Sequence, residues 1–427
     1  MKQTIISLIV LAVTLGSSGC HHNFQRFQYR KQAALLESRK TVSAKEAEPT
    51  KVTLLLPLTG ELAKTGLAVK EGFLAAYYAD ELKSAKLNIK IVDTNAEDIQ
   101  RLYQQAVTEG TEVVVGPITK EAVLSLHALK HLPIPIIALN SLDNYQRTYA
   151  ANLYQFGLLP QDEALQAAMR MLQIGITKCA IIEPASNWGN KIADTFSKHY
   201  ESKGGQIIAR FKYQLGDQLP EQLCTFLAAD QEKLCAPAKP ATSPKPSIEP
   251  ETELNPDVNS DTNPDEETDP QTGLRQDFDG FFLIANPVAG RQIIPLLKFY
   301  YAGDLPVYAI STIYGGNHEP ILDQDLNGVY FCDIPWLIQA PKAWDTSLQT
   351  IRAQQPYGQT SGKATNYSRL YALGLDAYKI ATKLNEFLFY AAYGTAGVTG
   401  KLHLDSYNHI YRELTWAVMR NGKPVAK

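Results

Sequence analysis

The chain has 427 residues, which corresponds to roughly two to four domains of ordinary size. Hydrophobic residues make up 45% and charged residues 20%, a composition typical of globular proteins. The 41 basic and 44 acidic residues leave a formal net charge of -3, which excludes a strongly basic nucleic-acid-binding protein. The only long apolar stretch lies at the N-terminus, which excludes a membrane protein with many spanning helices.

The first twenty residues have the layout of an export signal. A positively charged start precedes an apolar run from Ile5 to Leu15, which is too short to span a membrane, and small residues follow it. Cys20 comes next, and this arrangement resembles a bacterial lipobox, in which the cysteine is lipidated. We therefore expect residues 1–19 to be a lipoprotein signal peptide, with a plain cleaved signal as the alternative. His21, where an inner-membrane lipoprotein would carry Asp, favours the periplasmic face of the outer membrane.

Two segments have the composition of linkers. Residues 20–50 comprise the lipidated cysteine and a polar stretch of mixed charge, which we expect to form a tether. Residues 237–276 contain eight prolines among Thr, Ser, Asn and acidic residues. Such a segment cannot bury enough apolar surface to offset the entropy lost on ordering. We expect it to be a disordered, acidic, proline-rich insertion.

From residue 51 onward, short apolar runs alternate with helix-like segments. The run VTLLLPL is typical of a strand buried on both faces of a parallel sheet, and LAVKEGFLAAYYADEL then places apolar residues on one helical face. The next predicted strands are NIKIVD, EVVVG and PIIAL, followed by KCAIIEP, QIIARFKY, DGFFLIA and LPVYAI. The later helices are predicted near residues 119–130, 161–173, 188–203, 217–229 and 288–301.

This alternation predicts an α/β fold with two lobes, each built on a doubly wound parallel sheet. We expect residues 51–427 to form one two-lobed body. Lobe 1 would comprise about residues 51–150 and 312–390, and lobe 2 about residues 151–311 and 391–427.

Polar residues come directly after several of the predicted strands, at the sheet edge where ligand clefts of such folds open. Their hydroxyl and amide groups, together with helix N-terminal N–H groups, can hold a carboxylate. The same residue types also cap helices and form turns, which leaves a purely structural role as the alternative. The candidate cleft residues are Thr59, Gly60, Thr119, Asn140, Ser141, Asn187 and Trp188.

The motifs of common catalytic sites are absent from the sequence. It contains no GxGxxG, no CxxC and no GxSxG, and GTAGVTGKL lacks the glycine spacing of a phosphate-binding loop. His318-Glu319 lacks the second histidine of a zinc-binding helix, and Pro320 would break such a helix. We therefore expect no enzyme, no cofactor and no metal site, although Ser, His and Asp residues could still converge from distant positions.

Four cysteines remain once Cys20 is set aside. Cys179, Cys224, Cys235 and Cys332 allow three pairings, and an exported protein meets an oxidising environment. Cys224–Cys235 closes the shortest loop and is the preferred disulfide. Buried free thiols are the alternative.

Three segments resemble the type 1 periplasmic binding proteins. LLLPLTGELAKTGLAVKEGFLAA is similar to the opening of that fold, VVVGPITKEAV to its second characteristic turn, and EPASNWGNKIADTF to the helix start in its second lobe. The resemblance implies the two-lobed fold and, by itself, no function.

Later segments are similar to a narrower family, the C-terminal domain of LpoA proteins. They are FLIANPVAGRQIIPLLKFYYAGDLPVYAIS, NGVYFCDIPWL, YSRLYALGLDAYKIATKL and GVTGKLHLDSYNHIYRELTWAVMRNGKPV. That family consists of outer-membrane lipoproteins that activate a class A penicillin-binding protein. The resemblance covers residues 51–427 outside the insertion. Long members carry a large helical domain before this one, whereas here only residues 21–50 separate Cys20 from the body.

The resemblance implies a non-catalytic outer-membrane lipoprotein that binds a class A penicillin-binding protein and regulates peptidoglycan synthesis. The alternative is a lipid-anchored solute-binding receptor for an amino acid or a small peptide. Aromatic residues are enriched at interface hot spots, so candidate contacts are Trp188, Tyr300, Tyr301, Tyr314 and Trp336, unless these side chains fill the core.

Overall fold

The computed structural model describes most of the predicted body. The described residues are 50–80, 86–129, 131–142, 150–235, 273–316, 319–357, 366–390 and 393–427. The predicted signal peptide, Cys20 and the tether up to residue 49 lie outside the described residues, as do residues 236–272 of the predicted insertion.

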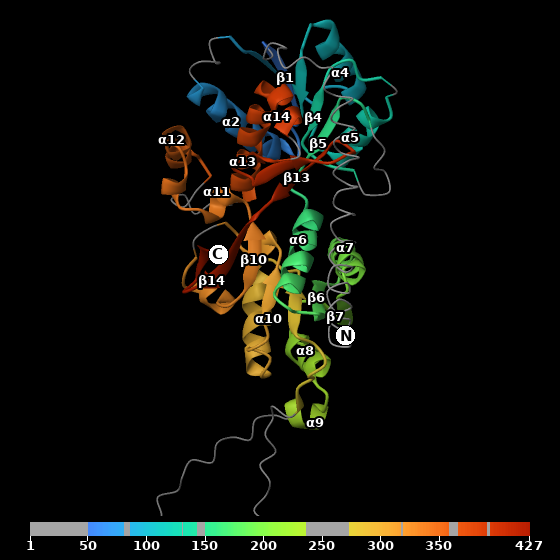
Figure 1. The fold of residues 1–427 in the computed structure, drawn as a ribbon, viewed down its shortest axis with the longest axis vertical. Coiled ribbons are helices and arrows are strands. Elements are labelled where there is room, and N and C mark those ends of the chain that lie inside the picture. Colours follow the sequence, from blue (N-terminus) through green and yellow to red (C-terminus); the bar gives the residue numbers. More distant parts are fainter. Residues whose placement is uncertain are drawn as a thin grey trace, which may run out of the picture.

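Lobe 1 is built on an eight-stranded sheet, the upper half of Figure 1. The strand order is β11-β12-β13-β5-β4-β3-β1-β2, parallel from β13 to β2 and antiparallel between β11, β12 and β13. The strands are β1 (Lys51–Leu56), β2 (Asn88–Asp93), β3 (Val113–Val115), β4 (Ile136–Ala138), β5 (Leu153–Phe156), β11 (Thr395–Ala396), β12 (Lys401–Leu404) and β13 (His409–Glu413).

Helices cover both faces of this sheet, which explains the nearly continuous apolar run of β1. Leu54 and Leu56 point into one buried cluster beneath α2 and α13, whereas Leu55 points into the opposite cluster beneath α4 and α5. Both faces of the strand are therefore in the core, as expected for a parallel sheet. The helices of lobe 1 are α2 (Ala63–Ala79), α4 (Ile99–Thr108), α5 (Lys120–His127), α12 (Thr346–Gln354), α13 (Asn366–Thr382) and α14 (Leu384–Tyr390).

Lobe 2 is built on a seven-stranded sheet of order β15-β14-β10-β9-β8-β6-β7. Its strands are β6 (Lys178–Pro184), β7 (Gln206–Tyr213), β8 (Gly280–Leu283), β9 (Val307–Ala309), β10 (Tyr330–Asp333), β14 (Thr415–Arg420) and β15 (Lys423–Ala426). Its helices are α6 (Pro160–Gln173), α7 (Asn187–Ser202), α8 (Leu219–Leu227), α9 (Gln231–Leu234) and α10 (Pro287–Phe299), with short 3-10 turns η3 (Ser311–Ile313) and η4 (Leu322–Leu326). The predicted helices thus lie within a few residues of the observed ones.

The predicted α/β, two-lobed fold is confirmed, with one refinement. Each sheet is mostly parallel but carries an antiparallel edge, and both edges come from the last part of the chain, β11 to β15. The sheets are therefore mixed rather than purely parallel.

The predicted lobe boundaries need correction. In the described part of the chain, the backbone crosses between the lobes three times, after β5, after β10 and after β13. β10, predicted in lobe 1, pairs with β9 and β14 of lobe 2, whereas β12 and β13, predicted in lobe 2, belong to the sheet of lobe 1. Figure 1 shows β13 leading from the upper lobe toward β14 in the lower one. The sheet to which a strand belongs depends on the strands with which it pairs. These lie far away in sequence, so local composition does not reveal them.

Two glycines allow α2 and α13 to pack with their backbones in close approach. A Cβ atom added at Gly374 would lie 2.1 Å from the Val69 carbonyl oxygen, and one added at Gly72 would lie 1.9 Å from the Tyr371 carbonyl oxygen. Neither contact is possible, so a larger residue at either position would push the two helices apart.

We expect Gly374→Ala to lower the free energy of unfolding by roughly 1–3 kcal/mol, the usual range for overpacking a tight core. Urea unfolding followed by circular dichroism measures this. Gly315→Ala is the control, because the nearest atom to its added Cβ lies 3.6 Å away, an ordinary contact. Equal stability of both variants would contradict the close helix packing.

At the far tip of lobe 2, a disulfide links α8 to the end of α9. Cys224 in α8 and Cys235 after α9 are bonded, the pairing preferred from the sequence, with their Cα atoms 5.8 Å apart, while Cys179 and Cys332 are buried free thiols. Residues 273–276, predicted as the end of the insertion, belong to the body, because Leu274 is buried. α9 lies at the lower end of Figure 1, so Cys235 and Gly273, the described residues on either side of the predicted insertion, lie near this tip.

Candidate functional site

The first predicted cleft turn comes after β1 and is held by its own hydrogen bonds. The Thr59 hydroxyl donates to the Asp93 carboxylate over 2.7 Å, and the Asn95 amide donates to the Thr59 carbonyl oxygen over 2.5 Å. The hydroxyl and the Leu58 backbone N–H hold the pKa of Asp93 below its ordinary value. Gly60 has φ +70°, which favours glycine. This turn is therefore built from mutual contacts between β1 and β2.

The turns after β3 and β4 use their polar side chains in the same way. The Thr119 hydroxyl accepts the Ala122 backbone N–H over 3.3 Å and caps α5. The Asn140 amide donates to the Ile118 carbonyl oxygen over 2.7 Å. The Ser141 hydroxyl is buried and has no hydrogen-bond partner among the described residues. Of the lobe 1 candidates, Ser141 alone has a buried hydroxyl that is not already bonded.

The candidate residues of lobe 2 lie at the start of α7. Asn187 is exposed, and Trp188 is 44% exposed. The side chain that caps this helix is Ser186, which accepts the Gly189 N–H over 3.1 Å. The candidates thus form two groups, one at the C-terminal strand ends of each lobe.

A cluster that the sequence did not reveal joins the two lobes where the chain crosses between them. Arg369 on α13 of lobe 1 binds Asp333 at the end of β10 of lobe 2, with Nε–Oδ1 and Nη2–Oδ2 distances of 3.0 and 2.5 Å. Arg369 also donates to the carbonyl oxygens of Ser311 and Tyr314. The side chains of Arg369 and Asp333 are only 13% and 1% exposed, so this ion pair is shielded from water.

Glu163 on α6 forms the second part of this cluster. Its carboxylate accepts the backbone N–H and the hydroxyl of Ser311, over 2.8 and 2.9 Å. Burial raises the pKa of Glu163 to about 7, and nearby Asp333 adds to the effect while Arg412 of β13 opposes it. We call Glu163, Ser311, Asp333, Arg369 and Arg412 the interlobe clamp.

Hydrogen bonds to the backbone also hold the crossing after β13 next to α6. The Gln166 side chain on α6 donates to the carbonyl oxygen of Arg412 over 3.0 Å and accepts the N–H of Leu414 over 2.9 Å. Arg412 itself is only 2% exposed. Residues from all three crossings thus meet around the start of α6.

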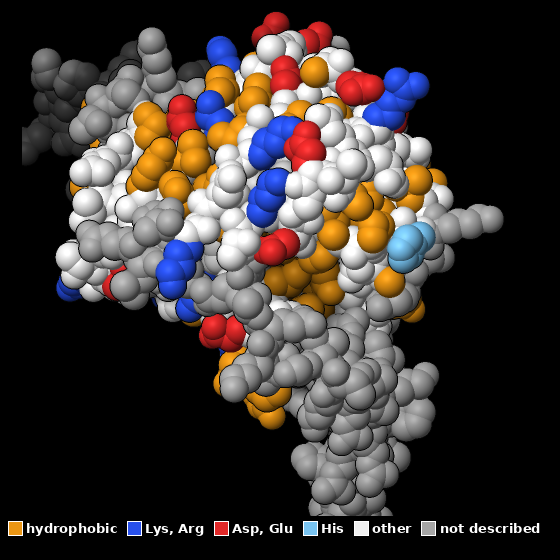
Figure 2. All heavy atoms as spheres, turned by 90° about the horizontal axis from the view of Figure 1, so that it is seen from above, with side chains coloured by type: hydrophobic (Ala, Val, Ile, Leu, Met, Phe, Trp, Pro, Cys, Tyr) orange, Lys and Arg blue, Asp and Glu red, His pale blue; other side chains and the backbone are white. Residues whose placement is uncertain are grey.

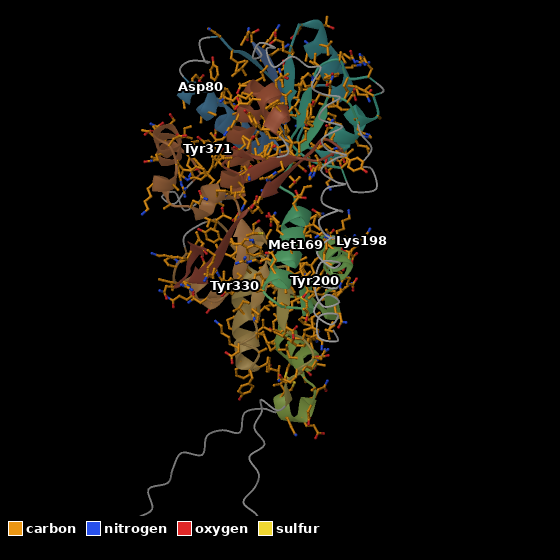
Figure 3. All side chains as sticks on the ribbon, in the orientation of Figure 1. Asp80, Met169, Lys198, Tyr200, Tyr330 and Tyr371 are labelled. Carbon is orange, nitrogen blue, oxygen red and sulfur yellow. A yellow bond between two sulfur atoms is a disulfide. The ribbon has the colours of Figure 1, made fainter. Side chains whose placement is uncertain are left out.

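An apolar cluster that includes Cys332 and Ile334, the neighbours of Asp333, contains residues of both lobes. Trp336, in the short helix α11 (Pro335–Ile338), is fully buried, and its backbone N–H donates to the Val398 carbonyl oxygen over 3.0 Å. Tyr371, labelled in Figure 3 among the helices of lobe 1, packs in the same cluster. The other buried members are Cys332, Ile334, Ile351, Ala372, Leu375, Val398 and Leu414.

The aromatic contacts predicted from the sequence divide accordingly. Trp336 and Tyr314 are buried, so for both of them the alternative holds that the side chain fills the core. Trp188 and Tyr301 are exposed, and Tyr300 is partly buried against the core of lobe 2.

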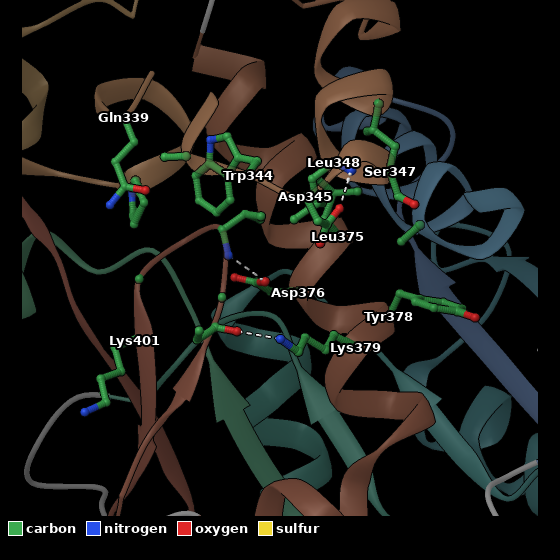
Figure 4. A pocket seen from close by; sticks show the side chains of 18 of the residues that line it. Gln339, Trp344, Asp345, Ser347, Leu348, Leu375, Asp376, Tyr378, Lys379 and Lys401 are labelled. Carbon is green, nitrogen blue, oxygen red and sulfur yellow. Dashed lines mark hydrogen bonds between the residues drawn. The ribbon is translucent and has the colours of Figure 1, made fainter. Parts of the chain in front are cut away.

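A pocket of about 980 Å³ lies beside the junction, between α12, α13 and the turn at residues 394–400 (Figure 4). None of the predicted cleft residues lines it. Asp376 on its wall accepts the backbone N–H groups of Val398 and Thr399 over 2.9 and 2.7 Å, and Lys379 donates to the Ala396 carbonyl oxygen over 2.6 Å. These charged side chains thus hold the neighbouring turn.

The part of the chain that the structure describes contains no group of three His, Cys, Asp or Glu side chains placed to hold a metal ion. None of the helices within those described residues combines the length and the apolarity that a membrane crossing requires. Seen from above lobe 1, charged side chains of both signs lie among separate apolar patches (Figure 2).

Comparison with known proteins gives a family and a fold. The model of the LppC family, described as putative lipoprotein, matches residues 34–237 and 262–422. The penicillin-binding protein activator LpoA of Vibrio antiquarius (strain Ex25) is 25% identical over 386 residues, which cover 89% of this chain and 59% of that protein. The chain thus spans less than two thirds of the length of this curated relative.

Solved structures show the same two-lobed fold. The LpoA (YraM) C-domain from Haemophilus influenzae, described as a regulator of PBP1A, has a TM-score of 0.65 at 21% identity, covering 88% of this chain and 99% of that chain. A putative branched-chain amino acid ABC transporter from Chromobacterium violaceum has a TM-score of 0.61 at 21% identity, covering 87% of this chain and 100% of that chain. At these identities the likeness concerns the fold alone.

Proposed function

Because this chain belongs to the LppC putative lipoprotein family, we propose that it is a non-catalytic outer-membrane lipoprotein, anchored through Cys20, that binds and activates a class A penicillin-binding protein. Its relative in Vibrio antiquarius is named for that activation. In structure, the chain matches 99% of the LpoA C-domain from Haemophilus influenzae, which is described as a regulator of PBP1A.

The observation that carries this proposal is the interlobe clamp. A solute receptor of this fold closes its lobes around the ligand by motion at the crossings. Here such motion would have to disturb the buried pair of Arg369 and Asp333, and removing one partner from such a pair is strongly unfavourable. A fixed relation between the lobes suits a protein-binding surface better than a closing cleft.

The side chains at the predicted cleft turns support the same conclusion. Thr59, Thr119 and Asn140 already use their polar groups inside the protein. A ligand that took over these bonds would gain little, because each new bond would replace an existing one.

Activation without catalysis requires only differential binding. The activator must bind the active state of the synthase more tightly than the inactive one, and it shifts the equilibrium by that difference. A tenfold preference corresponds to about 1.4 kcal/mol. Exposed aromatic side chains are suitable anchors for such a contact. Those on lobe 1 include Tyr78, Phe389, Tyr390, Tyr393, Tyr407 and Tyr411, and those on lobe 2 include Trp188, Phe299 and Tyr301.

Binding to the synthase tests the proposal. We expect the purified full-length chain to bind one of the organism's class A penicillin-binding proteins when that protein is immobilised. The amount bound should saturate with the concentration of the chain, and the chain should stay bound when the salt concentration is raised. Trp188→Ala and Phe389→Ala examine one exposed aromatic on each lobe, and Arg101→Ala on an exposed surface of α4 is the matched control. Failure to bind any class A synthase would overturn the proposal.

The second candidate function is a solute receptor. It is favoured by the likeness to the putative amino acid transporter structure and by the buried Ser141 hydroxyl at a predicted cleft turn. A receptor at 100 times its dissociation constant gains ~2.7 kcal/mol of stability, which a thermal shift detects. A clear shift with one amino acid or small peptide would favour this candidate. No shift across a broad set would exclude it for those ligands.

A further inference from the structure

We propose that Phe299 and Tyr301, two exposed aromatic side chains at the far tip of lobe 2, bind the class A penicillin-binding protein. We call these two residues the tip pair. The inference rests on the proposed function, because it names the part of the surface that meets the synthase. Three observations carry it: the backbone that holds Tyr301, the exposure of both side chains, and the place of the tip relative to the tether.

The backbone at the end of α10 holds Tyr301 in a conformation that is unusual for a tyrosine. The N–H of Ala302 donates to the Leu297 carbonyl oxygen over 2.8 Å, and the N–H of Tyr301 donates to the Lys298 carbonyl oxygen over 3.2 Å. These two bonds form a Schellman motif, in which the residue after the C-cap takes the left-handed conformation and is usually glycine. Here that residue is Tyr301, with φ +60°.

The other residues with positive φ show that a tyrosine is unexpected at such a position. Among the described residues, the remaining non-glycine positions of this kind are Asn152, Asn408 and Asn421. Asparagine tolerates the left-handed region because its short polar side chain bonds locally, whereas the backbone crowds the Cβ atom of a bulky residue. Glycine or asparagine would therefore form the same helix end with less strain than Tyr301.

Packing in the core does not account for this tyrosine. Ala302 and Tyr300, its neighbours in the chain, belong to the core of lobe 2 or pack against it. Tyr301 itself is 42% exposed, and Phe299 is 66% exposed. The Phe299 ring lies 5.0 Å from the ring of Tyr300, in an edge-to-face contact. Strain that brings no packing gain indicates a use for the side chain outside the molecule.

The tip pair lies at the end of the body that is remote from the tether. Residues 21–49 lead from Cys20 to Thr50 and β1, at the upper end of Figure 1, whereas α10 lies in the lower lobe. The chain crosses to lobe 1 after the C-terminal end of β10, whereas α10 ends before β9 begins, at the opposite edge of the lobe 2 sheet. With the chain anchored through Cys20, as proposed, this tip is the end that the anchor leaves free for a partner.

The chemistry of the tip pair indicates what the synthase must offer. Large aromatic side chains bury much apolar area when they enter a pocket, and tyrosine is among the residues that dominate interface hot spots. The two backbone bonds fix Tyr301 before the partner arrives, so less conformational entropy is lost on binding. We therefore expect an apolar pocket on the synthase. Truncating a hot-spot residue of this kind weakens binding about thirtyfold.

Binding of full-length variants to the immobilised synthase tests the inference. We expect Tyr301→Asn and Phe299→Ala each to weaken binding about thirtyfold. Asparagine tolerates the left-handed backbone, so Tyr301→Asn should melt at the same temperature as the parent chain or at a higher one. Circular dichroism measures the melting temperature. Loss of binding together with a lower melting temperature would assign Tyr301 to the fold and overturn the proposal.

Two control variants match these substitutions. Asn421→Gly also changes a residue with positive φ, and Leu124→Ala also truncates an exposed apolar side chain, which lies on α5 of lobe 1 and is 41% exposed. Both should bind the synthase as tightly as the parent chain. If the parent chain binds and the tip-pair variants bind equally tightly, the proposed function stands and this inference is wrong. If no class A synthase binds the parent chain, both are wrong.

Discussion

Replacing Arg369 with alanine should lower the free energy of unfolding by roughly 3–5 kcal/mol, the range for removing one partner of a buried ion pair. The substitution leaves the Asp333 carboxylate in a site that is only 1% exposed and without its bidentate partner. It also removes the donor that serves the carbonyl oxygens of Ser311 and Tyr314. Urea unfolding at pH 7 measures the loss.

Two comparisons make this result specific. Arg101→Ala removes an ion pair with Glu97 in which the arginine side chain is 78% exposed, and such surface pairs contribute at most about 1 kcal/mol. The double variant Arg369→Ala, Asp333→Ala should be more stable than the sum of the single effects predicts, because no buried charge is then left alone. Additive single effects, or a loss no larger than that of Arg101→Ala, would contradict the clamp.

Trp336→Ala should lower the free energy of unfolding by roughly 3–5 kcal/mol, as expected for emptying a large core site. Its side chain is fully buried among residues of both lobes, and its Nε1–H donates to the Gln355 side chain over 3.0 Å. Trp336→Phe keeps most of the volume and should lose clearly less.

Trp188→Ala is the surface counterpart of this substitution. Its side chain is 44% exposed at the start of α7, so its removal should change stability by no more than about 0.5 kcal/mol. If Trp336→Ala left stability unchanged and instead reduced synthase binding, Trp336 would be a surface contact and its assignment to the core would be wrong.

The elements of the fold could be predicted from the sequence because each leaves a local pattern. The run after Lys51 is apolar on both faces, and the structure buries β1 between two layers of helices. The division into lobes could not be predicted in the same way. The local composition of β10 and β13 does not indicate the sheet to which each belongs, because pairing with strands far away in sequence determines it.

For the candidate site as well, local patterns could be predicted from the sequence and distant contacts could not. Thr59, Thr119 and Asn140 could be proposed as cleft residues because polar residues come directly after strands, but the bond between Thr59 and Asp93 of β2 is not visible in the sequence. The clamp was missed because its members are spread from Glu163 to Arg412. The available signal was weak: Asp333 is the single charged residue in the apolar run YFCDIPWL, and such a residue needs a buried partner. Arg412 lies in HIYRELTW beside His409 and Glu413, so its burial leaves no such signal.

The measurement that tests the proposed function most directly is the rate of peptidoglycan crosslinking by a purified class A penicillin-binding protein, with and without the full-length chain. We expect the rate to rise severalfold and to saturate at the concentration at which binding saturates. The chain alone should form no product. An unchanged rate at saturating chain, together with a thermal shift by an amino acid or small peptide, would contradict the activator and favour the solute receptor.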